Sequence, residues 1–434
     1  MTRPMKDSGI EWLGEIPQGW VIQKTKFLFE VVNGATPRSG NSDYWEGCIP
    51  WMTPADFITA RKYITEPRRY ITEKGLNSCG TRLVPKGSII VSTRAPIGSI
   101  AMAEFQLCTN QGCKSLIKKE EVYPDYYYYF LSVMDSALNA LGEGTTFAEL
   151  SSSNFGNFYL PVPTIKEQQD ISNYLDSVCA QIDKVITSKQ NSNELLKEHR
   201  QSIIYEAVTK GLGRNALMKD SGIEWIGMIP LEWGLEKLKF SAEINPRADI
   251  ALKDEDDVSF VPMDNLKFGF HTTTLVPYER VKKGYVPFSE GDILIAKVTP
   301  CFENGNLAIA SNLRDGVGFG STEITVIRAE NIHVRYLYYY FQNPKFIERG
   351  TYDMYGVAGL KRLPTSFFAN TCIPTPTLWE QKTISDYLDD KCGEIDRLIR
   401  ANNLTIEKLI EYRQGIIFEA VTGKMEVPRN CGGR

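Results

Sequence analysis

The stretch Met5-Lys6-Asp7-Ser8-Gly9-Ile10-Glu11-Trp12 occurs a second time, residue for residue, from Met218 to Trp225. Subtracting 5 from 218 gives an offset of 213 residues between the two copies. Internal repeats are the first feature to establish in a sequence, because they decide its architecture. The match continues at the same offset through Gly14, Ile16, Pro17 and Trp20, which recur as Gly227, Ile229, Pro230 and Trp233.

Two further blocks repeat at this offset. Residues 161–186 resemble residues 374–399, and residues 200–209 resemble residues 413–422. The segments between the blocks have diverged, with only faint similarities such as 87–91 beside 291–295. An old duplication kept for stability is the simpler interpretation, but it does not explain why the flanks match while the middles differ. A shared scaffold that carries two different recognition domains explains both.

The repeated flanks have the apolar spacing of long helices. Apolar residues recur at intervals of three and four, which predicts a heptad-like seam on one helix face. Pro163-Thr164 and Pro376-Thr377 precede the two runs, and Gly211 and Gly423 follow them, as at helix starts and stops. About 44 residues at about 1.5 Å each would make a helix of roughly 65 Å. The predicted helix-packing residues are Ile171, Leu175, Val178, Ile182, Leu196 and Ile203, with Val185 also in the pattern, and Ile384, Leu388, Ile395, Leu398, Leu409 and Ile416 in the second copy.

The middle of each seam is polar. Lys189 and Ser192 fall on it in the first copy, and Asn402 and Thr405 in the second. Polar seam residues weaken a coiled coil but can fix its register. A partly exposed or kinked helix is the alternative, and the sequence does not separate the two.

The order of these segments predicts an α+β fold with a pseudo-two-fold internal repeat. The first helix ends where the second domain begins, and the second helix leaves that domain with a similar length. If the seams pack together, the helices run antiparallel, with one globular α/β domain at each end. The expected boundaries are 1–165 and 211–378 for the domains, 166–210 and 379–424 for the helices, and 425–434 for a tail.

The variable domains contain short strands and tyrosine-rich segments. Residues 89–91 and 99–103 are typical of strands, and 125–131 and 336–341 are expected to form helices that pack on a sheet. A run of tyrosines can stack on nucleic-acid bases. Such aromatics more often belong to a core with their hydroxyls at its rim, which is the interpretation we favour.

Local basic pairs, polar loops and strand ends are the candidate contacts to DNA. Lysine and arginine bind phosphates and guanine edges, and threonine can serve several bases. A solvated surface or ordinary turn chemistry is the alternative for each of them. The basic pairs are Arg61-Lys62, Arg68-Arg69, Lys282-Lys283 beside Arg280, and Lys361-Arg362; the loops are 142–146, with Thr145 and Thr146, and 356–362; the strand ends give Thr93, Arg94, Lys297 and Thr299.

With these motifs the chain resembles the specificity subunit of type I restriction-modification systems over nearly its whole length. The motifs that support this resemblance are Gly34-Ala35-Thr36-Pro37, Ile49-Pro50-Trp51, Gly318-Phe319-Gly320-Ser321-Thr322-Glu323 and the repeated blocks. The resemblance implies that the two globular α/β domains are target-recognition domains. Each reads one half of a split, asymmetric site in double-stranded DNA, and the helices set the gap. The resemblance further implies two methyltransferase (modification) subunits that methylate adenine with S-adenosylmethionine, and motor-nuclease (restriction) subunits that use ATP and Mg. The individual base contacts do not transfer within this family.

The composition of the chain limits the classes of function that it can have. The chain has 434 residues, 42% of them hydrophobic, and a net charge of −4, which argues against tight unaided binding to DNA. Its nine cysteines and three histidines form no Cys-x-x-Cys pair or zinc-type cluster, which indicates buried thiols in a reducing compartment. With neither a signal peptide nor an apolar run of about 18 residues, we expect a cytoplasmic protein without a membrane partner.

Three function classes remain. The sequence contains no Asn-Pro-Pro-aromatic methylation motif, no phosphate-binding loop and no carboxylate pair for metal-dependent cleavage, so we expect a non-catalytic subunit without a cofactor of its own. A free-standing nuclease or methyltransferase is the first rival, and a cofactor-binding assay would reveal it. A scaffold that grips proteins rather than DNA is the second rival, and it predicts no dependence of site-specific methylation on this chain.

Overall fold

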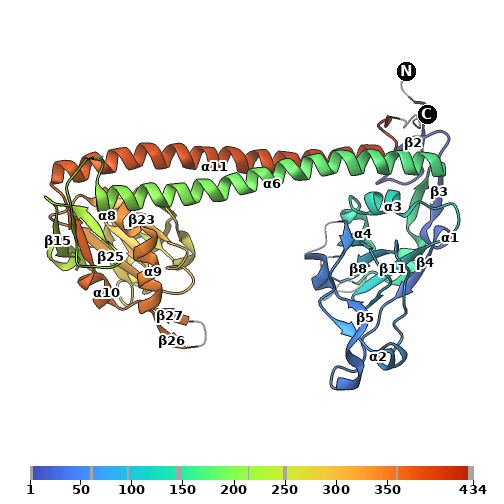
Figure 1. Cartoon of the computed structure of the whole chain (residues 1–434), viewed down its shortest axis with the longest axis horizontal. Helices are drawn as coiled ribbons and strands as arrows, with labels where there is room; N and C mark the ends of the chain where they lie inside the picture. Colours follow the sequence, from blue (N-terminus) through green and yellow to red (C-terminus); the bar gives the residue numbers. More distant parts are fainter. Residues whose placement is uncertain are drawn as a thin grey trace. The chain divides into compact units, whose positions relative to one another are not determined.

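The computed structural model describes residues 3–58, 62–94, 97–142, 149–213, 215–247, 252–357 and 360–428. The chain forms two compact units (Figure 1): unit 1 is Met1–Ser188 with Leu404–Arg434, and unit 2 is Lys189–Asn403. Two long helices, α6 (Ile165–Lys210) and α11 (Leu378–Val421), each contribute one part to both units. Each unit therefore consists of one globular α/β domain and a segment of both helices.

Unit 1 is built on a five-stranded sheet in the order β4-β11-β8-β9-β6. All its pairings are antiparallel except that of β6 with β9, and the central strand β8 is completely buried. Strands β8 and β9 confirm the strands predicted around 89–91 and 99–103. The bounds are β4 Phe29–Asn33, β11 Cys113–Lys118, β8 Ile89–Ser92, β9 Ile100–Ala103 and β6 Tyr63–Ile64, with a second sheet of β10 Cys108–Thr109, β5 Trp45–Met52 and β7 Tyr70–Ile71, and short helices α1 Thr25–Leu28, α2 Glu73–Asn77, α4 Asp135–Ala140 and α5 Ser152–Asn157.

Unit 2 contains two four-stranded sheets, in the orders β16-β25-β22-β23 and β20-β17-β24-β21. Strand β22 is completely buried like β8 of unit 1, and it pairs with β25 as β8 pairs with β11. The bounds are β16 Ala242–Ile244, β25 Ile324–Ala329, β22 Ile293–Ala296, β23 Leu307–Ile309, β20 Thr274–Pro277, β17 Asp257–Val261, β24 Val317–Gly320, β21 Val286–Ser289, the hairpins β18 Leu266–Lys267 with β19 Phe270–His271 and β26 Tyr355–Val357 with β27 Leu360–Arg362, and helices α7 Tyr278–Val281, α9 Pro344–Asp353 and α10 Thr365–Asn370.

The repeated sequences form the same elements in both units. Each first phrase makes a hairpin with the same register, in which Met5 faces Pro17 and Met218 faces Pro230. A second antiparallel pair then leads into each long helix. These elements are β1 Met5–Asp7, β2 Glu15–Pro17, β3 Val21–Lys24 and β12 Tyr159–Val162 in unit 1, and β13 Met218–Asp220, β14 Met228–Pro230, β15 Gly234–Lys237 and β28 Cys372–Thr375 in unit 2.

The repeated Thr-x-x-Glu phrase of unit 1 forms a capping box at the start of α6. The Thr164 N–H donates to Glu167 Oε2 at 3.2 Å, and the Glu167 N–H donates to Thr164 Oγ1 at 3.3 Å. The indole Nε1 of Trp20 also donates to Glu167, as Trp233 does to Glu380 in unit 2. The repeated residues therefore tie the first hairpin of each unit to a helix start.

The two predicted helix stops are confirmed. Helix α6 ends at Lys210, immediately before Gly211, and α11 ends at Val421, two residues before Gly423. Both glycines have a φ of +72°, a backbone conformation that favours glycine.

The tyrosine runs form helices α3 (Pro124–Leu131) and α8 (Val334–Phe341), and their side chains lie in the main apolar core of each unit. The core interpretation is therefore confirmed. The hydroxyl of Tyr126 donates to the carbonyl of Val421, and that of Tyr336 donates to the carbonyl of Val208. Each tyrosine thus joins its domain to the end of a long helix.

A second contact, present in both units, also holds each domain on a long helix. Tyr129 donates to Asp176 at 2.6 Å in unit 1, and Tyr339 donates to Asp389 at 2.7 Å in unit 2. Burial is the main cause that raises the pKa of both tyrosines, so the hydroxyls remain donors to the carboxylates. Residues 176 and 389 differ by the repeat offset, so duplication preserved this anchor.

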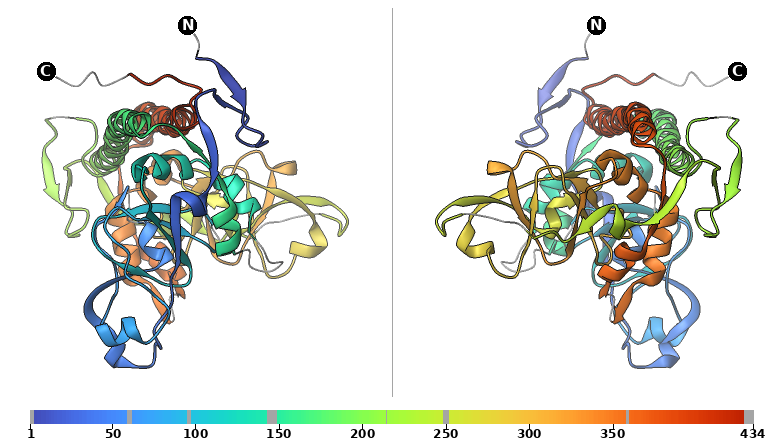
Figure 2. Two further views of the ribbon diagram at one scale, coloured as in Figure 1. Left: turned by 90° about the vertical axis from the view of Figure 1, so that its right-hand side faces the viewer. Right: turned by 90° about the vertical axis from the view of Figure 1, so that its left-hand side faces the viewer.

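Within each unit a segment of α6 packs against a segment of α11, and Figure 2 shows these helices end-on. In unit 1, Leu175 near the start of α6 shares a core with Ile417 near the end of α11. In unit 2, Val208 near the end of α6 shares a core with Leu388 near the start of α11. The helix segments are therefore antiparallel in both units, as predicted.

Most of the predicted seam residues lie in this interface, with two errors. Leu398 is 54% exposed, and Val185 is also exposed. After Ile182 and Ile395 the inward position comes four residues later, so Ile186 and Ile399 are half-buried instead. The buried predicted residues are Ile171, Leu175, Ile182, Ile384, Leu388, Ile395 and Ile416, and the half-buried ones are Val178, Leu196, Ile203 and Leu409.

The polar part of the seam is hydrogen-bonded between the helices in unit 2. Lys189 Nζ donates to Asn402 Oδ1 at 3.0 Å, and Asn402 Nδ2 donates to Asn193 Oδ1 at 2.9 Å. Asn193 Nδ2 in turn donates to Asn403 Oδ1 at 2.8 Å. These bonds form only when particular residues face one another, so they support the interpretation that the polar residues fix the register.

Candidate nucleic-acid interface

In each domain the buried central strand leads to a short bridge with a distant segment. Past β8, Arg94 pairs with Glu149, and past β22, Val298 pairs with Arg362. Both partner segments lie shortly before the small helices α5 and α10. The predicted strand ends are thus joined in both domains to the segment that contains, or directly follows, the predicted polar loop.

In unit 2, four predicted DNA-binding residues come together: Lys297, Thr299, Lys361 and Arg362. The Thr299 N–H donates to the carbonyl of Lys361, and the Lys361 N–H donates to Thr299 Oγ1, both at 3.0 Å. Arg362 Nε donates to Glu323 Oε2 at 2.9 Å. Burial lowers the pKa of Lys297, and the nearby Glu323 partly offsets this effect. Glu323 is a site residue that no local sequence signal marks.

The predicted polar loop at 356–362 is partly wrong, because its described residues form the hairpin of β26 and β27. Tyr355 pairs with Arg362, and Gly356 pairs with Lys361, while residues 358–359 lie outside the described residues. A Cβ on Gly356 would lie 2.2 Å from the carbonyl oxygen of Leu360, so the hairpin requires a glycine here.

The hairpin presents apolar and basic side chains together. Tyr355, Leu360, Lys361 and Arg362 are exposed on it, and the neighbouring Tyr352 is the most exposed large apolar side chain of the described residues, at 88%. Aromatic rings beside cations suit nucleic-acid bases and phosphates. The sequence does not mark Tyr352 and Tyr355 as candidates, because they stand alone rather than in a run.

Unit 1 brings fewer of the predicted residues together. Thr93 is completely buried, and Lys62 is paired with Asp125 at 2.7 Å and with Asp176 at 2.5 Å. Both are therefore poor candidates for direct contacts to DNA. Arg94 is exposed and pairs with Glu149 at 3.1 Å. Arg61, Thr145 and Thr146 lie outside the described residues.

The remaining basic candidates lie on other elements. Arg68 and Arg69 are exposed, and the guanidinium carbon of Arg69 lies 3.9 Å from the ring centroid of Trp45. Lys282 follows α7 and pairs with Asp254 at 2.6 Å, next to the exposed Lys283. Helix α7 packs on β17 and β20, which belong to the other sheet of unit 2 from β22.

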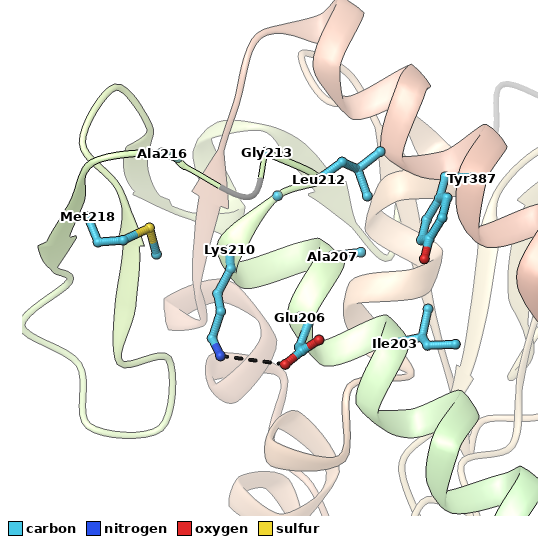
Figure 3. A pocket seen from close by; sticks show the side chains of 10 residues that line it. Ile203, Glu206, Ala207, Lys210, Leu212, Gly213, Ala216, Met218 and Tyr387 are labelled. Atoms are coloured by element: carbon cyan, nitrogen blue, oxygen red, sulfur yellow. Dashed lines mark ion pairs between the residues drawn. The ribbon is translucent and has the colours of Figure 1, made fainter.

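A cavity of about 600 Å³ in unit 2 is lined by none of these candidate residues (Figure 3). It is lined by the end of α6, the segment after it and Tyr387 of α11, and its charged residues Glu206 and Lys210 pair with each other at 3.7 Å. Among the described residues, no group of three or more histidine, cysteine, aspartate or glutamate side chains could hold a metal ion. Within the same residues, every helix is too short or too polar to cross a bilayer.

The family model of the type I restriction modification DNA specificity domain matches residues 17–197 and 242–409. The chain belongs to this family. The two matched stretches include most of both globular domains and large parts of both long helices. Family membership therefore applies to the whole duplicated arrangement.

Several curated relatives in this family are specificity subunits. The chain is 38% identical over 189 residues to the MjaIX specificity subunit of Methanocaldococcus jannaschii, a match that covers 43% of each chain. It is 45% identical over 161 residues to the EcoAI specificity subunit of Escherichia coli, covering 36% of this chain and 27% of that protein. These two matches span less than half of the relatives' lengths. The MjaVIII specificity subunit is 23% identical over 424 residues, covering 95% of this chain and 94% of that protein.

Solved structures of this family share the fold. A chain from a structure described as the basis of complex assembly and conformational transition of the type I R-M system has a TM-score of 0.72 at 16% identity, covering 94% of this chain and 99% of that one. The HsdS subunit from Thermoanaerobacter tengcongensis has a TM-score of 0.50 at 16% identity, covering 94% and 98%. The predicted fold of two α/β domains joined by two long helices is confirmed.

Proposed function

We propose that this chain is the DNA sequence-specificity subunit of a type I restriction-modification complex, with each globular domain reading one half of a bipartite, asymmetric site. The observation that carries the proposal is a duplicated scaffold that holds two dissimilar domains by identical contacts. Tyr129–Asp176 and Tyr339–Asp389 are one such pair of contacts. A common support with different domains suits a protein that reads two different sequences in one duplex.

In this proposal the chain recognises DNA and its partners perform the chemistry. Two methyltransferase subunits would bind S-adenosylmethionine, and motor-nuclease subunits would bind ATP and Mg. The basic clusters of both domains would contact DNA, whereas the net charge of −4 keeps unaided binding weak. Gel shifts with and without the methyltransferase subunit measure this difference.

Exchanging one domain tests the proposal directly. Replacing residues 21–160 with the corresponding segment of another specificity subunit is expected to change one half of the methylated site and leave the other intact. The contact between Trp20 and Glu167 lies outside the exchanged segment, so the first hairpin stays tied to the start of α6. Sequencing of modified bases in the host genome gives both halves at once. A change in both halves, or methylation that does not depend on the chain, would contradict domain-by-domain reading.

We further propose that α6 and α11 together set the gap between the half-sites. Inserting seven residues in both helices lengthens each by about 10 Å, which corresponds to about three base pairs of DNA. The preferred gap is expected to grow by that amount, while the bases of the half-sites stay the same. Sequencing of modified bases measures the gap directly.

Insertion of the same seven residues into α6 alone is the control. It misaligns the bonds that Lys189 and Asn193 make to α11, so site-specific methylation is expected to be lost. An unchanged gap in the double insertion would show that the helices do not act as the spacer.

A further inference from the structure

In both domains a lysine and a threonine occupy the same two positions on neighbouring strands, but in opposite order. Lys114 of β11 pairs with Val91 of β8, and the matching residue of β25 in unit 2 is Thr325, which pairs with Ile295 of β22. The residues that follow β8 and β22 are Thr93 and Lys297, respectively. Each domain thus keeps one lysine and one threonine at the same two places, in opposite order.

These two places are close enough for their side chains to interact. The Thr93 N–H donates to the carbonyl of Gly112, two residues before Lys114, and the Lys297 N–H donates to the carbonyl of Glu323, two residues before Thr325. The lysine and the threonine are therefore diagonal neighbours on one sheet face, within the reach of a long side chain.

Three of these four residues are buried, and the fourth is half-buried. Thr93 and Thr325 are both 0% exposed, and neither hydroxyl has a hydrogen-bond partner among the described residues. Lys114 is 6% exposed and donates to Asn33 Oδ1 at 3.0 Å, and Lys297 is half-buried. Burial lowers the pKa of both lysines. Burying such polar groups lowers the stability of a fold, so their presence calls for an explanation.

An arginine–glutamate ion pair lies beside the lysine in each domain. In unit 1 it is Arg94 with Glu149 at 3.1 Å, and both residues are exposed enough to be reached from solvent. In unit 2 it is Arg362 with Glu323, with Arg362 half-exposed. The charges of each ion pair affect the pKa of the lysine in the same domain: the glutamate raises it and the arginine lowers it. The arginine follows the central strand in unit 1 but comes from the distant segment in unit 2, so sequence alignment conceals the match.

The charges of this cluster favour a base edge over a phosphate. A phosphate would be repelled by the glutamate, whereas a base pair in the major groove offers acceptors and an amino donor together. Guanine O6 and N7 accept from arginine, and the amino group of cytosine or adenine donates to a carboxylate. The lysine and the threonine lie deeper and are linked to the ion pair through the backbone, because Thr93 directly precedes Arg94 and the Lys297 N–H donates to the carbonyl of Glu323.

Resting on the proposed function, we propose that Arg94–Glu149 and Arg362–Glu323 are the matched base-reading pairs of the two half-sites. The arginine of each pair donates to guanine, and the glutamate accepts from an exocyclic amino group. Lys114 with Thr93, and Lys297 with Thr325, are positioning residues for these pairs. Each domain therefore specifies at least one base pair through the same chemistry, despite its different sequence.

The test uses the full chain co-expressed with its methyltransferase partner, with sequencing of modified bases as the readout. Glu149→Gln is expected to reduce discrimination at one base pair of one half-site by about tenfold, and Glu323→Gln at one base pair of the other half. Lys114→Met and Lys297→Met are expected to weaken discrimination at the same two base pairs without changing the preferred base. If a glutamine variant fails to assemble, Arg94→Lys and Arg362→Lys test the same positions, because lysine cannot bind guanine in the bidentate manner of arginine.

Matched controls come from other surface ion pairs of the same units. Glu30→Gln breaks the pair with Arg82 in unit 1, and Glu348→Gln breaks the pair with Lys345 in unit 2. Both are expected to leave the methylated sequence unchanged. Unaltered discrimination in the Glu149 and Glu323 variants would overturn the inference, and so would a uniform loss at all sequences, which is typical of a phosphate contact. The failure of the unmodified complex to methylate any specific sequence would instead refute the proposed function.

Discussion

Leu388→Ala is expected to lower the free energy of unfolding of unit 2 by about 2–5 kcal/mol. Leu388 is 0% exposed and belongs to the core that α11 shares with the end of α6 and with α8. Truncation leaves a cavity that the two helices cannot fill without losing their register, because the polar contacts of Lys189 and Asn193 fix it. Chemical denaturation combined with hydrogen exchange of the amides of unit 2 measures the loss.

Leu398→Ala is the matched control for this change. Leu398 lies on the same helix with the same side chain, but it is 54% exposed. Its truncation is expected to cost less than about 0.5 kcal/mol, as for most surface substitutions. Equal costs for the two variants would mean that Leu398 lies in the seam after all, and that the helix face assigned to the interface is wrong.

Arg200→Ala is expected to destabilise unit 2 by about 2 kcal/mol, mainly by leaving a buried amide without its partner. Arg200 is 8% exposed, lies 3.3 Å from Asp396 and donates to Gln342 Oε1 at 2.9 Å. Its guanidinium carbon also lies 4.9 Å from the ring centroid of Phe268. One side chain of α6 therefore contacts α11, the residue that follows α8, and the hairpin of β18 and β19.

Arg413→Ala tests the same residue type at the matching position of the repeat. Arg413 pairs with Asp183 at 3.4 Å in unit 1, but its side chain is 34% exposed. Water screens this pair, so its loss is expected to cost less than about 1 kcal/mol. Thermal unfolding followed separately in each unit compares the two variants. If Arg413→Ala proved as damaging as Arg200→Ala, burial would not be the cause of the difference.

The parts of the fold that repeat could be predicted, because identical sequences at a fixed offset indicate identical structures. The helices, their glycine stops and the buried tyrosine runs all follow from local spacing and residue type. The error at Leu398 arose because spacings of three and four are equally apolar there, and only packing decides between Leu398 and Ile399. Register of this kind is a tertiary property that a single helix does not encode.

The candidate site was harder to predict. Four residues of the unit 2 cluster were identified, but their partner Glu323 was not, since an isolated acidic residue has no local signal. In unit 1 the sequence indicated Thr93 and Arg94 without showing that one points inward and the other outward. Lys114 was missed entirely, because a lysine in an apolar strand is expected on the solvated face, whereas here it is buried beside Asn33.

The division of the long helices between the units has a consequence for damaged genes. The last part of α11 supplies Ile416, Ile417, Ala420 and Val421 to the core of unit 1, whose globular domain precedes that of unit 2 in the chain. A stop codon shortly after Asn403 would spare every residue of unit 2 and yet strip the first domain of the helix that covers its tyrosines. Late truncations would therefore first impair the earlier-made of the two domains.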